Sequence, residues 1–364
     1  MLRSLVGFLL LGPISLSPLA AVPAPSSAGY APVEIKTTVL GDGVYQFTIV
    51  SDGYVQQLNS VAVVTRTDVL VFDTTTRPST ARRILDEIRR LTSKPVRYVV
   101  NSHWHPDHWS GNQAFADVNP NLEIISTEQE RDFMLNTTSL WSRVMPEEAN
   151  AEEDAFAKEV RTGQIAPGVP LTPERKTADE LDLKRAHDMT DEQRKLRRVY
   201  PNLTFTDRMV LRHGGREFQF ISVTGDAAGT TVMYLPKEKI LVTGDTVSYP
   251  IPYYTPPLSV HAASIRQLAQ LDADTVVPGH GPAFHDKRYM LLEADLFDEV
   301  LRQVRDILRG GGVSIDDVQK AVNFDAFKER FAHGDAELSS EFNAFTPGVV
   351  RKAYIELRDS KEIR

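Results

Sequence analysis

The segment that most constrains this chain is a short cluster of histidine and aspartate after a predicted strand. Three histidines and one aspartate fall within six residues directly after the apolar run Val96 to Val100: His103, His105, Asp107 and His108. Imidazole nitrogens and carboxylate oxygens are ligands of zinc and similar divalent cations. Alternate side chains of an extended stretch share one face, so His103 and His105 can bind one cation. Pro106 then turns the chain and directs the next two ligands toward a second cation.

The elements around this cluster predict an α/β fold. Val44 to Val50 and Ser60 to Thr65 are rich in β-branched residues, and Val69 to Phe72 is a short apolar run. Ser79 to Leu91 has apolar residues at helical spacing, with charged residues on the opposite side. A strand–helix–strand unit that ends in a loop of ligand-type residues is where α/β folds place their chemistry.

Composition narrows the class of function. Asp plus Glu is 49 against 41 for Lys plus Arg, which gives a formal net charge of −8. A nucleic-acid partner is therefore not expected, because phosphate binding needs a basic surface, and we expect a small-molecule substrate. The 364 residues include no cysteine, which excludes disulfides, thiolate catalysis and cysteine-ligated zinc. No Gly-x-Ser-x-Gly elbow of a serine hydrolase is present.

The N-terminus has the pattern of an export signal. Arg3 gives a short positive region, Leu5 to Leu11 is apolar but too short to span a membrane, and small residues follow at Ala20 to Ala24. We expect a signal peptide at 1–24 and a periplasmic or secreted protein, with a disordered leader or an uncleaved anchor as the alternatives. No other stretch approaches the roughly 20 apolar residues of a membrane helix, so the mature protein should have no membrane span.

The pattern His-x-His-x-Asp-His before Gly111-Asn112 resembles the signature of the metallo-β-lactamase superfamily, and the resemblance covers roughly Val33 to Phe297. It implies a four-layer αβ/βα sandwich with a two-metal site between the sheets. It also implies that Asp73, after the strand Val69 to Phe72, supports the site from outside the metal ligands. Asp245 would bridge both metals, and His280 in Pro-Gly-His-Gly would bind the second.

The third motif of the family departs from the usual sequence. The family usually has Gly-His-Thr-x-Gly, whereas this chain has Gly225-Asp-Ala-Ala-Gly229. Counting back from Leu235-Pro236 places Asp226 at the histidine position; a one-residue shift of the loop is the alternative, but no histidine lies nearby. The resemblance then implies three ligands for each metal beside the shared Asp245: His103, His105 and Asp226 for the first, and Asp107, His108 and His280 for the second.

Asp226 should change the chemistry of the first metal. A third carboxylate cancels the positive charge that two divalent ions keep beside two carboxylates and a hydroxide, so the bound water should be less acidic. We expect a higher pH optimum, a weaker Lewis acid, or Mn²⁺ or Fe²⁺ at the Asp226 site in place of the Zn²⁺ expected for the pair. In the alternative, Asp226 is only a turn residue and the first site is weak or empty.

The resemblance implies a binuclear metal-dependent hydrolase. A hydroxide between the metals would attack an amide, ester or thioester carbonyl, with a β-lactam as one possible substrate, and Asp107 would orient the nucleophile or pass a proton. The alternative hypothesis, from another class of function, is a metal-binding or ligand-sensing protein with a degenerate first metal site and little turnover. Tyr249, Tyr253 and Tyr254, in a proline-rich loop after Asp245, are the predicted substrate wall; a rigid connector is the alternative.

The predicted hydrolase domain covers 25–300 and a C-terminal helical extension covers 301–364. Apolar spacing predicts helices at Tyr289 to Leu308, Ile315 to Val322 and Phe342 to Leu357, which pack on the sandwich or form a dimer contact. Residues 146–198 are rich in charge and poor in large apolar groups, so we expect a solvated helical insertion or a mobile flap.

Overall fold

The computed structural model describes residues 30–53, 55–137, 154, 157–166, 169–254, 257–311 and 313–359. The predicted signal peptide at 1–24 and the first residues of the 146–198 insertion lie outside this part of the chain. Among the helices that the structure describes, none combines the length and the apolar composition that crossing a membrane requires.

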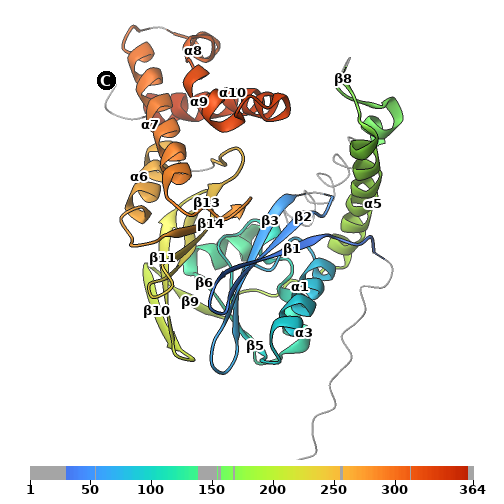
Figure 1. Cartoon of the computed structure of the whole chain (residues 1–364). Coiled ribbons are helices and arrows are strands. Elements are labelled where there is room, and N and C mark those ends of the chain that lie inside the picture. The colour runs from blue at the N-terminus through green and yellow to red at the C-terminus, as the bar shows by residue number, and fades with distance from the viewer. Residues whose placement is uncertain are drawn as a thin grey trace, which may run out of the picture.

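Twelve of the described strands form one hydrogen-bonded sheet with two halves, the first and the second sheet, which are joined at one edge only (Figure 1). The first sheet has the order β1 (Ile35–Gly41), β2 (Val44–Ser51), β3 (Gln56–Val64), β4 (Val69–Phe72), β5 (Val96–Val100), β6 (Glu123–Thr127) and β9 (Leu203–Phe205). The second has the order β10 (Arg208–His213), β11 (Arg216–Thr224), β12 (Ala228–Leu235), β13 (Ile240–Ser248) and β14 (Thr275–His280). A single residue pair, His280 with Leu58, joins β14 to β3.

Helices cover the outer face of each sheet (Figure 1). On the first sheet lie α1 (Pro78–Leu91) and α3 (Asn112–Val118), and on the second lie α6 (Leu258–Leu268) and α7 (Arg288–Leu308). The chain continues into α8 (Ile315–Ala321), α9 (Asp325–Ala332) and α10 (Ala336–Asp359). The helix predicted at Ser79 to Leu91 is confirmed to within one residue.

Three apolar cores separate four layers, as the alternation of side chains along the strands requires. In β4, Leu70 and Phe72 enter the core between the sheets, while Val69 and Val71 pack under α1 and α3. In β11, Phe218 and Phe220 enter the same inter-sheet core from the other side. The predicted four-layer αβ/βα sandwich is therefore the observed fold.

The charged insertion differs from its expectation. Its long helix α5 (Pro173–Lys195) buries its second half, mostly through polar groups, against the segment before β1, the end of β2 and the start of α1. Asp188 accepts the Ala31 N–H at 2.6 Å, and Asp182 accepts the Ser51 hydroxyl at 2.8 Å. This half of α5 is anchored by hydrogen bonds to the sandwich, so it is not a solvated flap.

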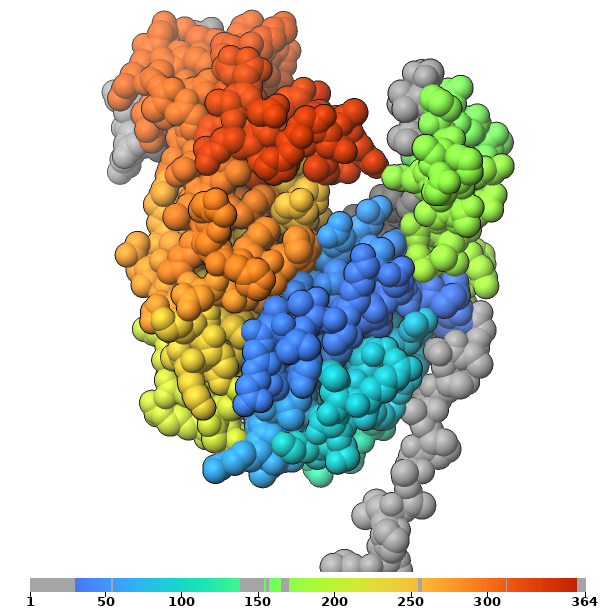
Figure 2. All heavy atoms as spheres, viewed as in Figure 1, coloured from blue at the N-terminus to red at the C-terminus, as the bar shows by residue number. Residues whose placement is uncertain are grey.

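The C-terminal helices share one core with α6 and α7. Phe331 of α9 and Phe342 of α10 are fully buried in it, so these helices pack on the second half of the sandwich. The sequence did not predict α9, and α10 begins at Ala336, six residues before the expected start. Figure 2 shows α10, in red, reaching across toward the green insertion, where Arg175 and Glu337 pair at 2.9 Å.

Candidate metal centre

The predicted ligands converge at the seam between the two sheets. The first sheet contributes the loop after β5 and the short helix α2 (Pro106–Trp109), which carry His103, His105, Asp107 and His108. The second sheet contributes three side chains: Asp226 from the turn between β11 and β12, Asp245 from β13, and His280 from the end of β14. These side chains form two groups, with Asp245 in both, whose candidate ligand atoms lie within 4.8 Å of one another.

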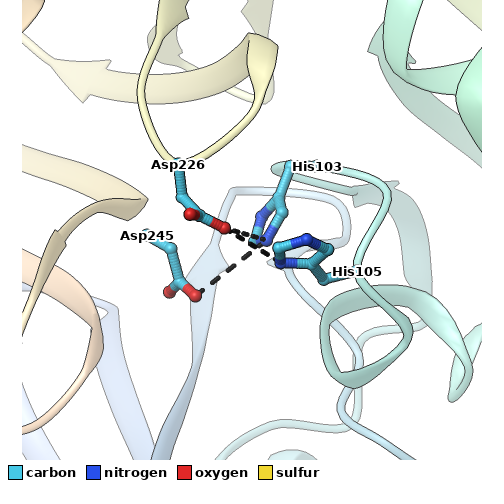
Figure 3. Close-up of side chains that lie close together, drawn as sticks. All are labelled: His103, His105, Asp226 and Asp245. Carbon is cyan, nitrogen blue, oxygen red and sulfur yellow. Dashed lines mark ion pairs between the residues drawn. The ribbon is translucent and has the colours of Figure 1, made fainter. Parts of the chain in front are cut away.

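The first group contains the departure from the family sequence (Figure 3). Asp226 Oδ2 lies 3.0 Å from His105 Nδ1 and 3.9 Å from His103 Nε2, and Asp245 Oδ2 lies 3.9 Å from the same His103 atom. Asp226 is 3% exposed. Its carboxylate is therefore a member of the cluster and not an ordinary turn residue.

The second group is tighter. Asp107 Oδ2 lies 3.2 Å from Nε2 of both His108 and His280. Asp245 Oδ2 lies 3.4 Å from His108 Nε2 and 3.7 Å from His280 Nε2. Asp245 thus faces histidines of both groups, which is the position a shared ligand needs.

The donor atoms fit a pair of divalent cations. Nε2 of His103, His108 and His280 is buried without a hydrogen-bond partner, and so is Oδ1 of Asp245. Unsatisfied buried polar atoms are costly, so the three imidazole nitrogens beside the carboxylates call for a ligand. Imidazole nitrogen with carboxylate oxygen is a donor set for zinc and neighbouring divalent ions.

The opposite side of each of these rings is fixed by a hydrogen bond. His108 Nδ1 contacts Asp73 Oδ2 at 2.8 Å, and His280 Nδ1 contacts the Gln56 carbonyl at 2.9 Å. His103 Nδ1 contacts the Ser102 hydroxyl at 2.9 Å, which itself donates to Asp73. Anchoring Nδ1 orients Nε2 toward the centre, as metal-binding histidines require.

The surroundings shift the pKa values of His103 and His108 in opposite directions. Burial lowers the pKa of His103 well below its usual value, aided by the adjacent histidines. Burial alone would do the same to His108, but the carboxylates of Asp107, Asp245 and Asp73 raise its pKa well above the usual value. In the absence of cations, a proton on His108 would offset part of the negative charge.

Close packing excludes side chains at two glycines near the candidate ligands. A Cβ at Gly279 would overlap Asp245 Oδ1, and a Cβ at Gly111 would overlap the carbonyl of Thr74. Asn59 of β3 donates to the carbonyls of Pro278 and Gly281 at 2.9 and 2.7 Å. These contacts fix the His280 turn against the first sheet.

The three predicted substrate tyrosines occupy different places. The Tyr253 ring lies 5.7 Å from the His280 ring in an edge-on arrangement and is 48% exposed. Desolvation by the surrounding protein, followed by the charges of Asp245 and Asp107, raises the pKa of Tyr253. Tyr249 packs against Phe284 and Tyr289, and Tyr254 packs against Phe345, so Tyr253 is the one of the three beside the metal centre.

Two residues of the centre were not predicted from the sequence. Ser102 connects Asp73 to His103, and its position inside the histidine loop was the available signal. Glu130 lies buried near Asp226, and burial raises its pKa well above the usual value. Thr127-x-x-Glu130 matches a helix capping box, and the Thr127 hydroxyl does accept the Glu130 N–H. The sequence pattern therefore favours a helix-capping role for these residues over a role at the metal centre.

The family model described as "Metallo-beta-lactamase superfamily" matches residues 53–280. The chain belongs to this superfamily. A linear primary-alkylsulfatase from Pseudomonas sp. (strain ATCC 19151) is 25% identical over 253 residues, which cover 66% of this chain and 43% of that protein. The chain therefore spans less than half the length of this relative.

Solved structures show the same fold. The inverting sec-alkylsulfatase Pisa1 from Pseudomonas sp. has a TM-score of 0.58 at 16% identity, covering 88% of this chain and 50% of that one. A metallo-beta-lactamase family protein from Thermus thermophilus has a TM-score of 0.51 at 19% identity, covering 84% of this chain and 94% of that one. Both likenesses concern the fold alone.

Proposed function

We propose that this protein is a metal-dependent hydrolase that uses two divalent cations. The observation that carries the proposal is the convergence of seven ligand-type side chains on one space, where three imidazole Nε2 atoms are buried without a partner. His103, His105 and Asp226 would hold the first cation and Asp107, His108 and His280 the second, with Asp245 shared. Zn²⁺ is the expected ion, with Mn²⁺ or Fe²⁺ as candidates at the Asp226 site.

The bound cations would supply Lewis acidity and a nucleophile at neutral pH. The chain's own residues would orient the reactants. Asp107 is 13% exposed at the side chain, whereas His108 beside it is fully buried, so the Asp107 carboxylate can reach a water and accept its proton. Tyr253, whose exposed ring lies beside His280, offers an aromatic face and a hydroxyl to a substrate.

An ester-type bond is the substrate class we propose to test first. The amide, ester and thioester carbonyls expected from the sequence remain candidates. Sulfate esters join them because the curated relative is an alkylsulfatase and matches two thirds of this chain. A binding or sensing protein with a weak first site is the alternative, and the place of Asp226 inside the first ligand group counts against it.

A substrate panel with metal removal tests the proposal. The panel contains a chromogenic cephalosporin, a nitrophenyl ester, a thioester, nitrophenyl sulfate and a linear alkyl sulfate. We expect turnover of at least one class, its loss with chelator, and its return with Zn²⁺ or Mn²⁺. His280→Ala should reduce turnover by at least about a hundredfold.

His285→Ala is the matched control, because His285 is exposed and lies five residues further along the chain. It should leave turnover unchanged. Turnover that persists after complete metal removal would contradict the proposed mechanism. Two bound cations without turnover of any class would favour the sensing alternative.

A further inference from the structure

The loop between β13 and α6 brings Tyr253 to the metal centre. Its first described stretch, residues 249–254, follows Ser248 at the end of β13 and places the Tyr253 ring edge-on to His280. No regular secondary structure holds residues 252–254. The position of Tyr253 therefore depends on what contacts the loop.

Helix α7 fixes the start of this loop. The Tyr289 hydroxyl donates to the carbonyls of Ser248 and Pro250 at 3.0 and 2.9 Å. The Tyr249 ring packs 5.3 Å from the Tyr289 ring and 5.9 Å from the Phe284 ring. These contacts end before Tyr253.

Helix α10 contacts the chain at Tyr254 and again at the start of α6. The Tyr254 ring lies 5.2 Å from the Phe345 ring of α10. The Tyr254 hydroxyl lies so close to Gly348 that a Cβ at Gly348 would overlap this hydroxyl. At the start of α6, Glu356 of α10 accepts the Leu258 N–H at 2.7 Å and the Ser259 N–H at 3.3 Å. The C-terminal helix thus contacts Tyr254 and the first residues of α6.

We propose that α10 positions Tyr253 at the metal centre, with Gly348 as the positioning residue that admits the Tyr254 hydroxyl. The C-terminal helical region then belongs to the substrate side of the site, although none of its described residues is in a ligand group. This inference rests on the proposed hydrolase function for its catalytic consequence. The structural part of the inference, that α10 holds residues 249–254 in place, does not depend on that function.

The geometry offers a compensating pair of substitutions. Gly348→Ala should push Tyr254 away, because the new methyl group occupies the space of the hydroxyl. Tyr254→Phe removes that hydroxyl and leaves ring carbon Cζ 3.2 Å from the added Cβ, a contact that a shift of a few tenths of an ångström relieves. The double variant should therefore recover the original loop position.

The test measures hydrogen exchange at the amides of residues 249, 251, 253 and 254 together with kcat and KM. Gly348→Ala should raise exchange there by roughly tenfold and raise KM by roughly tenfold with unchanged metal content. The double variant should return both values to within about threefold of the parent. Ser340→Ala, on the exposed face of α10, is the control and should change neither.

Glu356→Gln is a second variant, because it weakens the other attachment of α10 without adding volume. It should also raise exchange in residues 249–254. Exchange in Gly348→Ala equal to that in Ser340→Ala, or a double variant no better than Gly348→Ala, would overturn the proposal. A parent that hydrolyses no member of the panel would refute the proposed function, while the exchange comparison would still decide the role of α10.

Discussion

Asp73 supports two ligand candidates at once while facing away from the metal-binding atoms. It accepts from Ser102 N–H at 2.7 Å and from the Ser102 hydroxyl at 2.8 Å, and it contacts His108 Nδ1. Burial raises the pKa of Asp73, although His108 and Ser102 act in the opposite direction. The Asp73 carboxylate thus orients the His108 ring directly and the His103 ring through Ser102, on the side opposite the metal-binding atoms.

Gly279 is the residue where the smallest change should have the largest effect on the centre. Gly279→Ala places a methyl group on Asp245 Oδ1, so the shared carboxylate must move. We expect the purified variant to lose most of its bound metal and to lose hydrolase activity by at least about a hundredfold. Elemental analysis beside an activity assay measures both.

Gly41→Ala is the matched control for this substitution. Gly41 lies in a strand, and an added Cβ would meet only the Ile240 side chain at an ordinary 3.7 Å. Its metal content should equal that of the parent. If Gly279→Ala retained full metal content, Asp245 would not be the shared ligand.

At the scale of elements, α5 is a structural part of the sandwich. Met189 and Ala186 are fully buried, and Gln193 donates to the Thr76 carbonyl at 2.6 Å. Gly53 approaches the α5 backbone so closely that a Cβ there would overlap Ala186 N. The helix therefore contributes to folding stability as well as to the shape of the molecule.

Met189→Ala should lower the free energy of unfolding by about 2–5 kcal/mol, the usual cost of truncating a fully buried large side chain. Lys184→Ala, on the exposed face of the same helix, should change it by less than about 0.5 kcal/mol. Urea unfolding of both variants measures the difference. Equal stabilities for the two variants would support the solvated helical insertion or mobile flap that the sequence predicts.

The contrast between α1 and α5 shows which elements the sequence predicts. Helix α1 has an apolar stripe facing a sheet, so its periodicity alone gives its bounds. Helix α5 is buried largely through Asp, Arg, Glu and Gln side chains that bond to backbone groups more than 100 residues away. No local pattern carries such contacts.

The candidate site likewise contains residues that the sequence predicts and residues that depend on tertiary packing. The histidine loop was predicted from local spacing, because its ligands are neighbours in sequence. The approach of Asp226, Asp245 and His280 came from resemblance to a family, and the structure brings all three to the loop. Ser102 and the contact of Gly348 with Tyr254 depend on tertiary packing and have no sequence signature. The signal peptide at 1–24 and export stay predictions.

At the scale of the whole molecule, the candidate ligands connect the two halves of the sandwich. Four come from the first sheet's side and three from the second's, while the sheets themselves share a single paired residue between β14 and β3. Bound cations would therefore stabilise the fold as well as supply chemistry, because a ligand that binds only the folded state favours it.

The most direct test of the two-cation centre is a Zn²⁺ titration of the chelator-treated protein by calorimetry, with elemental analysis of the dialysed product. Two equivalents per chain should bind to the parent, and one to Asp226→Ala, which leaves the second ligand group intact. One equivalent or none in the parent, or two in Asp226→Ala, would contradict this assignment of the metal centre.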